Sequence, residues 1–128
     1  MIAEYFGKEV LTQIEEKDFF AEIPKLREKC GDRAVMRAVH FYQENARVPK
    51  QVEALEKGDF ETFLSLVKES GYSSYMYLQN VIPAGYKEHQ DVAIALAVCE
   101  HLLNGKGAYR VHGGGFAGTV QAFVPFEI

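Results

Sequence analysis

The chain has 128 residues, of which 48% are hydrophobic and 25% are charged. This length allows one domain with a real core, residues 1–128, and leaves no room for a second, and the composition is unlike that of disordered chains. The formal net charge is −4, and the basic residues are scattered rather than clustered as a nucleic-acid surface requires. We therefore expect one folded domain that does not bind nucleic acid.

The sequence also lacks the marks of membrane insertion. No apolar run approaches the roughly 20 residues that cross a bilayer, and residues 1–7 lack a basic segment of the kind that begins a signal peptide. A cytoplasmic protein without a membrane partner is expected. Cys30 and Cys99 do not form a CxxC pair, so we expect buried thiols rather than a disulfide or a metal site.

Residues 2–29 are expected to be helical in short pieces, the second of which begins at Pro24. A longer amphipathic helix is predicted from Asp32 to Lys57, with Asp32 as its N-cap and Gly58 ending it. Pro49 lies inside this pattern, so the helix must kink there or restart with Pro49 in its first turn. The apolar positions of the pattern are Val35, Val39, Tyr42 and Ala46, followed by Val52 and Leu55.

Two further helices are predicted in the middle of the chain. Asp59 can cap the first, whose apolar stripe stops at Gly71, and the second runs from about Glu88 to Asn104 and closes at Gly105. The apolar residues are Phe60, Phe63, Leu64 and Val67 in the first helix, and Val92, Leu96, Cys99 and Leu103 in the second.

The last third of the sequence has the composition of strands. Ala108–Val111 and Thr119–Val124 are short, β-branched and aromatic, and the second run alternates in character. Asn80–Ile82 is the best candidate for a further strand to complete the sheet. Helices followed by a late strand pair predict an α+β domain, with helices packed on one face of an antiparallel sheet.

A glycine-rich segment separates the two predicted strands. Its glycines let the backbone approach a ligand closely, and successive backbone N–H groups can bind phosphate oxygens. A tight connection between strands needs the same residues, so both interpretations stay open. The spacing fits neither a Rossmann fingerprint nor a P-loop. The residues expected near a phosphate or nucleotide are Gly113, Gly114, Gly115, Phe116, Ala117 and Gly118, with His112 as an auxiliary hydrogen-bond donor or as a partner of backbone groups.

Three stretches resemble motifs of the GHMP kinase family in their galactokinase form. Tyr109–Thr119 resembles the third conserved motif, a short strand, then Gly-Gly-Gly-Phe-Gly-Gly, then a second strand. Residues 37–47 are similar to the helix that ends in Glu-Asn-x-Arg, and residues 58–70 to the sequence Gly-Asp, helix, Asn-Glu-Ser. The matches follow the family's order and near-family spacing from Asp32 to Pro125. The departures are Ala117 for Gly, His112 for Thr or Ser, and Lys68 for Asn.

The resemblance implies a GHMP kinase C-terminal domain with a ferredoxin-like fold, whose partner is an N-terminal catalytic domain absent from this chain. It implies that the intact enzyme transfers the γ-phosphoryl group of ATP, with Mg²⁺ on the nucleotide, to the anomeric hydroxyl of galactose. In the family, the sugar signature, the Ser-rich nucleotide loop and the catalytic Asp belong to the N-terminal domain. We therefore name no catalytic residue and no metal ligand here, and we expect the chain alone to be inactive.

Two residue sets have alternative interpretations. The tyrosines between residues 71 and 87 line a surface that faces the missing domain and favours self-association of the fragment, or they are ordinary tyrosines. Each of four carboxylates could be a base, but solvated helix faces or caps are expected. The tyrosines are Tyr72, Tyr75, Tyr77 and Tyr86. The carboxylates are Glu44, Glu69, Glu88 and Asp91.

Two other hypotheses about function remain open. The chain could be a free-standing small-molecule-binding or regulatory α+β module that holds an anionic ligand on residues 113–118. It could also be a structural piece used for docking or dimerisation.

Overall fold

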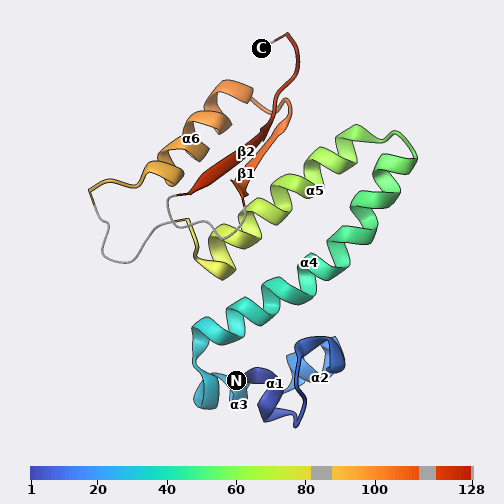
Figure 1. Cartoon of the computed structure of the whole chain (residues 1–128), viewed down its shortest axis with the longest axis vertical. Coiled ribbons are helices and arrows are strands. Elements are labelled where there is room, and N and C mark those ends of the chain that lie inside the picture. The colour runs from blue at the N-terminus through green and yellow to red at the C-terminus, as the bar shows by residue number, and fades with distance from the viewer. Residues whose placement is uncertain (82–87, 113–117, 128) are drawn as a thin grey trace.

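The computed structural model describes residues 1–81, 88–112 and 118–127, and most of these residues are helical (Figure 1). A long helical hairpin runs through the molecule, with short N-terminal helices at one end and a strand pair with a further helix beside its second arm (Figure 1). In chain order the elements are α1 (Ile2–Tyr5), the 3₁₀ turn η1 (Leu11–Gln13), α2 (Glu16–Ala21), α3 (Ile23–Cys30), α4 (Asp32–Glu56), α5 (Phe60–Ser73), the π-helical turn η2 (Ser74–Leu78), α6 (Asp91–Leu103), β1 (Ala108–His112) and β2 (Thr119–Phe123).

The N-terminal helices pack on the first half of α4 and form a core of their own. Phe19 and Leu26 are fully buried there, and the Phe19 and Tyr42 ring centroids are 5.2 Å apart. The Tyr42 hydroxyl donates to the backbone oxygen of Ile14 at 3.1 Å, which ties α4 to the segment before α2. The expected short helical pieces are confirmed, and Pro24 lies in the first turn of α3.

Helix α4 is continuous through Pro49, so of the two predicted alternatives, a kink or a restart, the restart is wrong. Proline removes the hydrogen bond to the carbonyl of Asn45, but both residues are exposed and water can reach that oxygen. The N-cap prediction is also wrong: Gly31 is the N-cap, and the Asp32 carboxylate instead accepts from Arg27 Nε at 2.7 Å. The predicted apolar pattern is confirmed only in part, because Ala46, Val52 and Leu55 are exposed. The buried positions of α4 are Val35, Ala38, Tyr42 and Ala54.

Asp59 caps α5 as predicted, because its carboxylate accepts from the backbone N–H of Thr62 at 3.2 Å. The predicted end at Gly71 is wrong: α5 continues to Ser73 and passes into η2, and the chain leaves this helix at Gln79, whose φ is +55°. The prediction that Phe60 belongs to the apolar stripe of this helix is also wrong. Phe60 is exposed in the first turn, whereas Leu66 and Val67 are buried.

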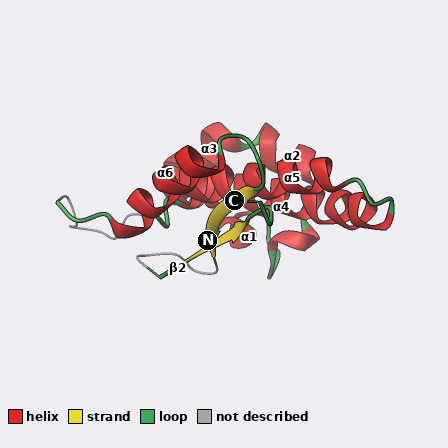
Figure 2. Ribbon diagram, turned by 90° about the horizontal axis from the view of Figure 1, so that it is seen from above, coloured by secondary structure: helices red, strands yellow, loops and turns green. Residues whose placement is uncertain are grey.

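The antiparallel strand pair lies between α5 and α6 (Figures 1 and 2). Ala108 pairs with Phe123, and His112 pairs with Thr119, close to the predicted strand bounds. Helix α6 begins at Asp91 rather than Glu88 and ends at Asn104 and Gly105, both with positive φ. A second core cluster joins the strands to α6 and consists of Val81, Val92 and Val111.

The predicted strand at residues 80–82 is wrong for the two positions that the structure describes. Asn80 and Val81 are buried, but neither belongs to a β-strand. They follow directly on Gln79, which has a left-handed backbone conformation. Ile82 lies outside the described residues. The broad expectation of helices packed against an antiparallel sheet is confirmed, and the described part of that sheet has two strands. Across the described ranges, every helix is too short or too polar to span a membrane.

Candidate functional site

Polar side chains from three distant segments meet where α4 packs against the end of α5, with β1 on the other side of α5. The α4 residues among them are four and three positions apart, so they share one helix face. The α5 and β1 residues come from segments more than twenty positions further along the chain. We call the following six residues the polar cluster: His40, Glu44, Arg47, Ser70, Ser73 and Arg110.

Glu44 is the acceptor that joins α4 to α5. Ser70 Oγ donates to Glu44 Oε2 at 2.6 Å, and Glu44 Oε1 lies 3.6 Å from Arg47 Nε. The Glu44 side chain is only 26% exposed. The expectation of a solvated carboxylate on a helix face is therefore wrong for Glu44, because a serine hydroxyl and a guanidinium group take the place of water.

Arg110 joins β1 to the same point. Its Nη1 donates to Ser70 Oγ, its Nη2 donates to Ser74 Oγ at 3.4 Å, and its Nε donates to the Val111 backbone oxygen at 2.8 Å. Ser70 is fully buried, so its hydroxyl accepts from Arg110 while it donates to Glu44. Charge-assisted hydrogen bonds of this kind are stronger than neutral ones. One serine hydroxyl thus connects α4, α5 and β1.

His40 lies on the same face of α4, where its surroundings disfavour the protonated imidazole. Its Nδ1 is 2.8 Å from Ser73 Oγ, and its Nε2 is 3.5 Å from Glu44 Oε2. Burial lowers the pKa of His40 below its ordinary value of 6.5, and the positive charges of Arg47 and Arg110 act in the same direction, against the opposing effect of Glu44. Protonation of His40 would therefore work against the packing of the cluster.

Two buried atoms of the cluster, Nε and Nη2 of Arg47, make no hydrogen bond with the described residues, although Nε lies 3.6 Å from Glu44 Oε1. Outside the cluster, Oδ1 of Asn80, from the segment after η2, is buried in the same way. The Arg47 side chain is 11% exposed. Buried donors and acceptors are normally satisfied, so water or a bound group is expected at these atoms.

Gly71 explains how α5 approaches β1 so closely. A Cβ atom built at Gly71 would lie 2.8 Å from Arg110 Cβ and 3.3 Å from the backbone oxygen of Tyr109. Glycine therefore serves here as a point of close packing inside a helix, not as a helix end. This contact brings the Arg110 side chain within reach of Ser70.

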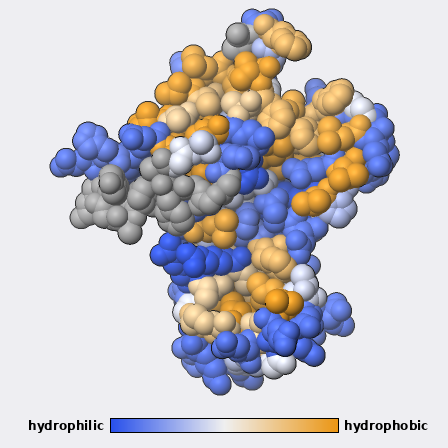
Figure 3. Space-filling model, in the orientation of Figure 1, coloured by the Kyte–Doolittle hydropathy of each residue, from blue (hydrophilic) through white to orange (hydrophobic). Residues whose placement is uncertain are grey.

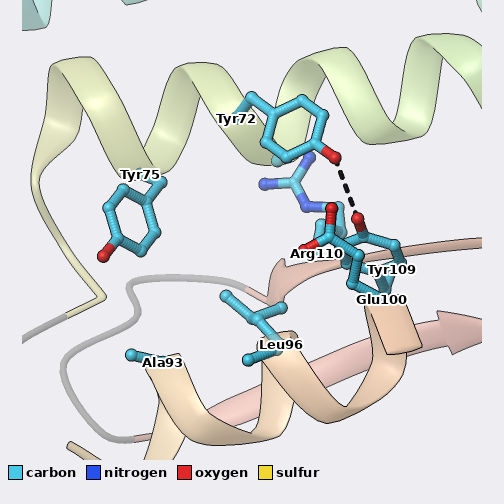
Figure 4. A pocket seen from close by; sticks show the side chains of 9 residues that line it. Tyr72, Tyr75, Ala93, Leu96, Glu100, Tyr109 and Arg110 are labelled. Carbon is cyan, nitrogen blue, oxygen red and sulfur yellow. Dashed lines mark hydrogen bonds between the residues drawn. The ribbon is translucent and has the colours of Figure 1, made fainter. Parts of the chain in front are cut away.

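A hollow of about 300 Å³ lies beside the polar cluster, between α5 and α6 (Figure 4). Tyr72 and Tyr75 line it from α5 and η2, and Leu96 faces them from α6 (Figure 4). The Tyr72 and Tyr109 phenol oxygens are 2.8 Å apart. Burial, the hydrogen bond with Tyr72 and the negative charge of Glu100 raise the pKa of Tyr109 above its ordinary value of 10.0. The lining of the hollow is mostly apolar, and the polar groups of Tyr72, Tyr109, Glu100 and Arg110 lie together at one end (Figure 4).

The predicted phosphate segment is described only at its edges. Residues 113–117 lie outside the described residues. His112 is exposed at the end of β1 and makes no side-chain hydrogen bond with the described residues, and Gly118 is exposed just before β2. The proposed roles of the segment and of His112 stay predictions.

The remaining predicted residues lie apart from the polar cluster. Glu69, Glu88 and Asp91 are exposed, as predicted for solvated carboxylates. Tyr77 is half-buried and Tyr86 lies outside the described residues. Cys30 and Cys99 are free thiols and only partly buried. In the ranges that the structure describes, no three or more His, Cys, Asp or Glu side chains are grouped to hold a metal ion.

Sequence reasoning missed the cluster as a unit, although it quoted several of its members. His40, Glu44 and Arg47 lie in one of the stretches that resemble the family, Ser70 ends the second, and Arg110 belongs to the third. The available signal was polar residues spaced four and three apart on a helix whose other face is apolar. Only the fold shows that the three stretches touch.

No family model matches the chain. A galactokinase of Thermotoga maritima is 35% identical to it over 113 residues, which are 88% of this chain and 30% of that relative. A galactokinase of Glaesserella parasuis serovar 5 is 28% identical over 125 residues, which are 98% of this chain and again 30% of the relative. The chain thus spans 30% of the length of these curated relatives.

Proposed function

Because the chain is homologous to galactokinases over most of its length, we propose that it is the C-terminal domain of a galactokinase. The proposal includes the ferredoxin-like fold of a GHMP kinase C-terminal domain, in which the described strand pair is part of a larger sheet. A matching N-terminal domain is its proposed partner.

The observation that carries the proposal is the meeting of the three family-like stretches in one cluster. The hydroxyl of Ser70 bonds both Glu44 and Arg110, which come from the first and the third stretch. Residues that resemble a family only by chance in separate stretches have no reason to bond each other. Their contact supports a shared, inherited arrangement.

The proposed reaction of the intact enzyme is transfer of the γ-phosphoryl group of ATP to the anomeric hydroxyl of galactose. Such chemistry depends on positioning and on charge stabilisation, with Mg²⁺ neutralising the phosphates. The described residues fit only an auxiliary part: no group of carboxylates is placed to hold the metal, and Arg110 is turned towards Ser70 and Ser74. We therefore assign catalysis to the N-terminal domain and none of it to this chain.

The role proposed for this chain is to place the glycine-rich segment beside the phosphates. That segment follows directly on His112, at the end of the strand that Arg110 anchors. The polar cluster would hold β1 in place and so fix the position from which the glycine-rich segment begins. Tyr72 and Tyr75, both exposed beside the hollow, are proposed to face the N-terminal domain. A cytoplasmic location is part of the same proposal.

The test is galactose-dependent ADP formation from ATP and Mg²⁺, measured for the chain alone and after adding a separately expressed N-terminal part of a related galactokinase. Activity only in the mixture is the expected result. The matched pair of variants is Ser70→Ala, which breaks the cluster, and Ser65→Ala, an exposed serine on the same helix. Ser70→Ala should lower the activity of the mixture while Ser65→Ala leaves it unchanged.

Two outcomes would contradict the proposal. Activity of the chain alone would mean that it holds a complete active site. No activity in the mixture, together with no binding between the two parts, would favour a free-standing binding module, for which the hollow between α5 and α6 is the supporting observation.

A further inference from the structure

The hollow between α5 and α6 is built by three elements that are held in fixed positions. It is lined by Gly71 and Tyr72 of α5, by Leu96 of α6, and by Tyr109 and Arg110 of β1 (Figure 4). The close contact of Gly71 with Arg110 sets the distance between α5 and β1. The volume of about 300 Å³ lies at the lower end of the range for small-molecule sites. The hollow is therefore large enough for one small molecule that carries a ring.

Aromatic and aliphatic side chains form the walls of the hollow. Tyr75 lies across it from Ala93 and Leu96 of α6 (Figure 4). Figure 3 shows that hydrophobic residues gather at the surface over α6, which forms one of these walls. Tyr72 and Tyr75 are exposed, so solvent reaches their rings in this chain. Such walls favour a planar ring, because a ring packs on tyrosine faces without loss of hydrogen bonds.

The hydroxyl groups at the polar end of the hollow have a fixed order of donors and acceptors. The Tyr109 hydroxyl bonds to Glu100, and because a carboxylate only accepts, Tyr109 is the donor. The phenol oxygens of Tyr72 and Tyr109 are 2.8 Å apart, so Tyr72 donates to Tyr109. Both hydroxyl hydrogens are thereby used within the chain. These three side chains offer a ligand only oxygen lone pairs.

Arg110 is the cation among the described residues that line the hollow, but its donors have other partners. Nη1 and Nη2 donate to Ser70 and Ser74, and Nε donates to the backbone oxygen of Val111. Glu100 is exposed and forms no ion pair with the described part of the chain. The polar end of the hollow therefore presents acceptors and a carboxylate without a cation in direct contact.

We propose that the hollow binds a small organic cation that carries a ring, of the arylalkylammonium class. The ammonium group donates to Glu100 and to the Tyr72 oxygen, and the ring lies between Tyr75 and Leu96. A positive charge beside tyrosine faces also gains from cation–π attraction. A neutral alcohol brings only one donor, and an anion brings none and is repelled by Glu100. The inference concerns the chain itself and does not rest on the proposed kinase function.

The first experiment is a titration with phenethylammonium, followed through the amide chemical shifts of the isotope-labelled chain. A probe of this size makes few contacts, so a dissociation constant on the order of 1 mM is expected. The shifts should be confined to residues that line the hollow. Phenethyl alcohol and phenylpropionate keep the ring but not the ammonium group, and they should bind about fivefold more weakly or not at all.

Two pairs of variants locate the site. Glu100→Gln should weaken phenethylammonium binding about fivefold, whereas Glu56→Gln, which neutralises an exposed glutamate of α4, should leave it unchanged. Ala97→Phe places a ring in the hollow and should abolish binding, whereas Ala46→Phe, at an exposed position of α4, should not. Circular dichroism checks that all the variants fold.

The alternative occupant of the hollow is a basic side chain of a partner domain. Phenethylammonium should still bind after a separately expressed N-terminal part of a related galactokinase is added. The inference is overturned if that part displaces the probe, if the chain does not bind the probe, or if the neutral and anionic analogues bind equally well. It is also overturned if Glu100→Gln or Ala97→Phe binds like the unchanged chain. ADP formation in the same mixture is a separate readout, so failure of the proposed function can be told apart from failure of this inference.

Discussion

Replacing Ser70 by alanine removes the hydroxyl that joins three elements of the fold. Ser70 is fully buried, donates to Glu44 and accepts from Arg110. Hydrogen bonds to charged groups contribute about 1.5–3 kcal/mol each, and charged groups left without a partner in a buried site add a further cost. Glu44 is 26% exposed and recovers some hydration, so we expect a net loss of about 3 kcal/mol of the free energy of unfolding.

Urea unfolding followed by circular dichroism measures this loss. Alanine is the better helix former by about 0.5 kcal/mol, so Ser65→Ala, at an exposed position of the same helix, corrects for propensity. The difference between the two variants corresponds to a melting temperature about 10 °C lower for Ser70→Ala. A double-mutant cycle with Glu44→Gln should give a coupling of about 1 kcal/mol.

The reasoning is refuted if the two alanine variants differ by less than about 0.5 kcal/mol, the usual range for surface substitutions. It is also refuted if Ser70→Ala and Glu44→Gln are additive, because the two side chains would then not act on each other. An unchanged m value is needed for either conclusion, since a changed m value signals a change in the unfolded or native ensemble.

Three further predictions concern single positions. Gly71→Ala should lose about 2 kcal/mol in thermal or urea unfolding, because its Cβ would lie 2.8 Å from that of Arg110; an unchanged stability would contradict the close contact of α5 with β1. Stability should fall as the pH drops below 6.5, because the unfolded chain takes up a proton that the partly buried His40 resists. His40→Gln should flatten this dependence in urea midpoints from about pH 5 to 8, and an unchanged dependence would contradict the reasoning. Asp59→Ala should lower the free energy of unfolding by about 1 kcal/mol, because α5 loses its N-cap. A decrease of less than about 0.3 kcal/mol in urea unfolding would contradict that role.

The elements that sequence analysis predicted well are those fixed by local chemistry. Asp59 caps α5 because its carboxylate reaches a backbone N–H only three residues away, and Gly58 ends the preceding helix because it adopts a φ of +71°. The two strands were predicted because their residues are β-branched and aromatic and flank one connecting segment.

The errors arose where contacts from distant residues override local preference. Gly71 was predicted to end a helix, but it lies inside one because the backbone of β1 passes against it. Of the two effects expected of Pro49, a kink or a restart, the restart is wrong: α4 continues through it, and the exposed Asn45 lets water reach the carbonyl that loses its hydrogen bond. Asn80 and Val81 were expected to be extended, but the left-handed Gln79 before them directs them into the core.

The sequence by itself determined most helix and strand positions, the family resemblance and the segments that carry it, because these depend on residues within a few positions of one another. Only the tertiary structure decided that Glu44, Ser70 and Arg110 meet, and that Tyr72 and Tyr109 bond each other beside a hollow. The physical reason is that a hydrogen bond between α5 and β1, or a hollow between α5 and α6, depends on how elements pack across more than twenty intervening residues. Local periodicity carries no information about which polar side chains are brought out of water together.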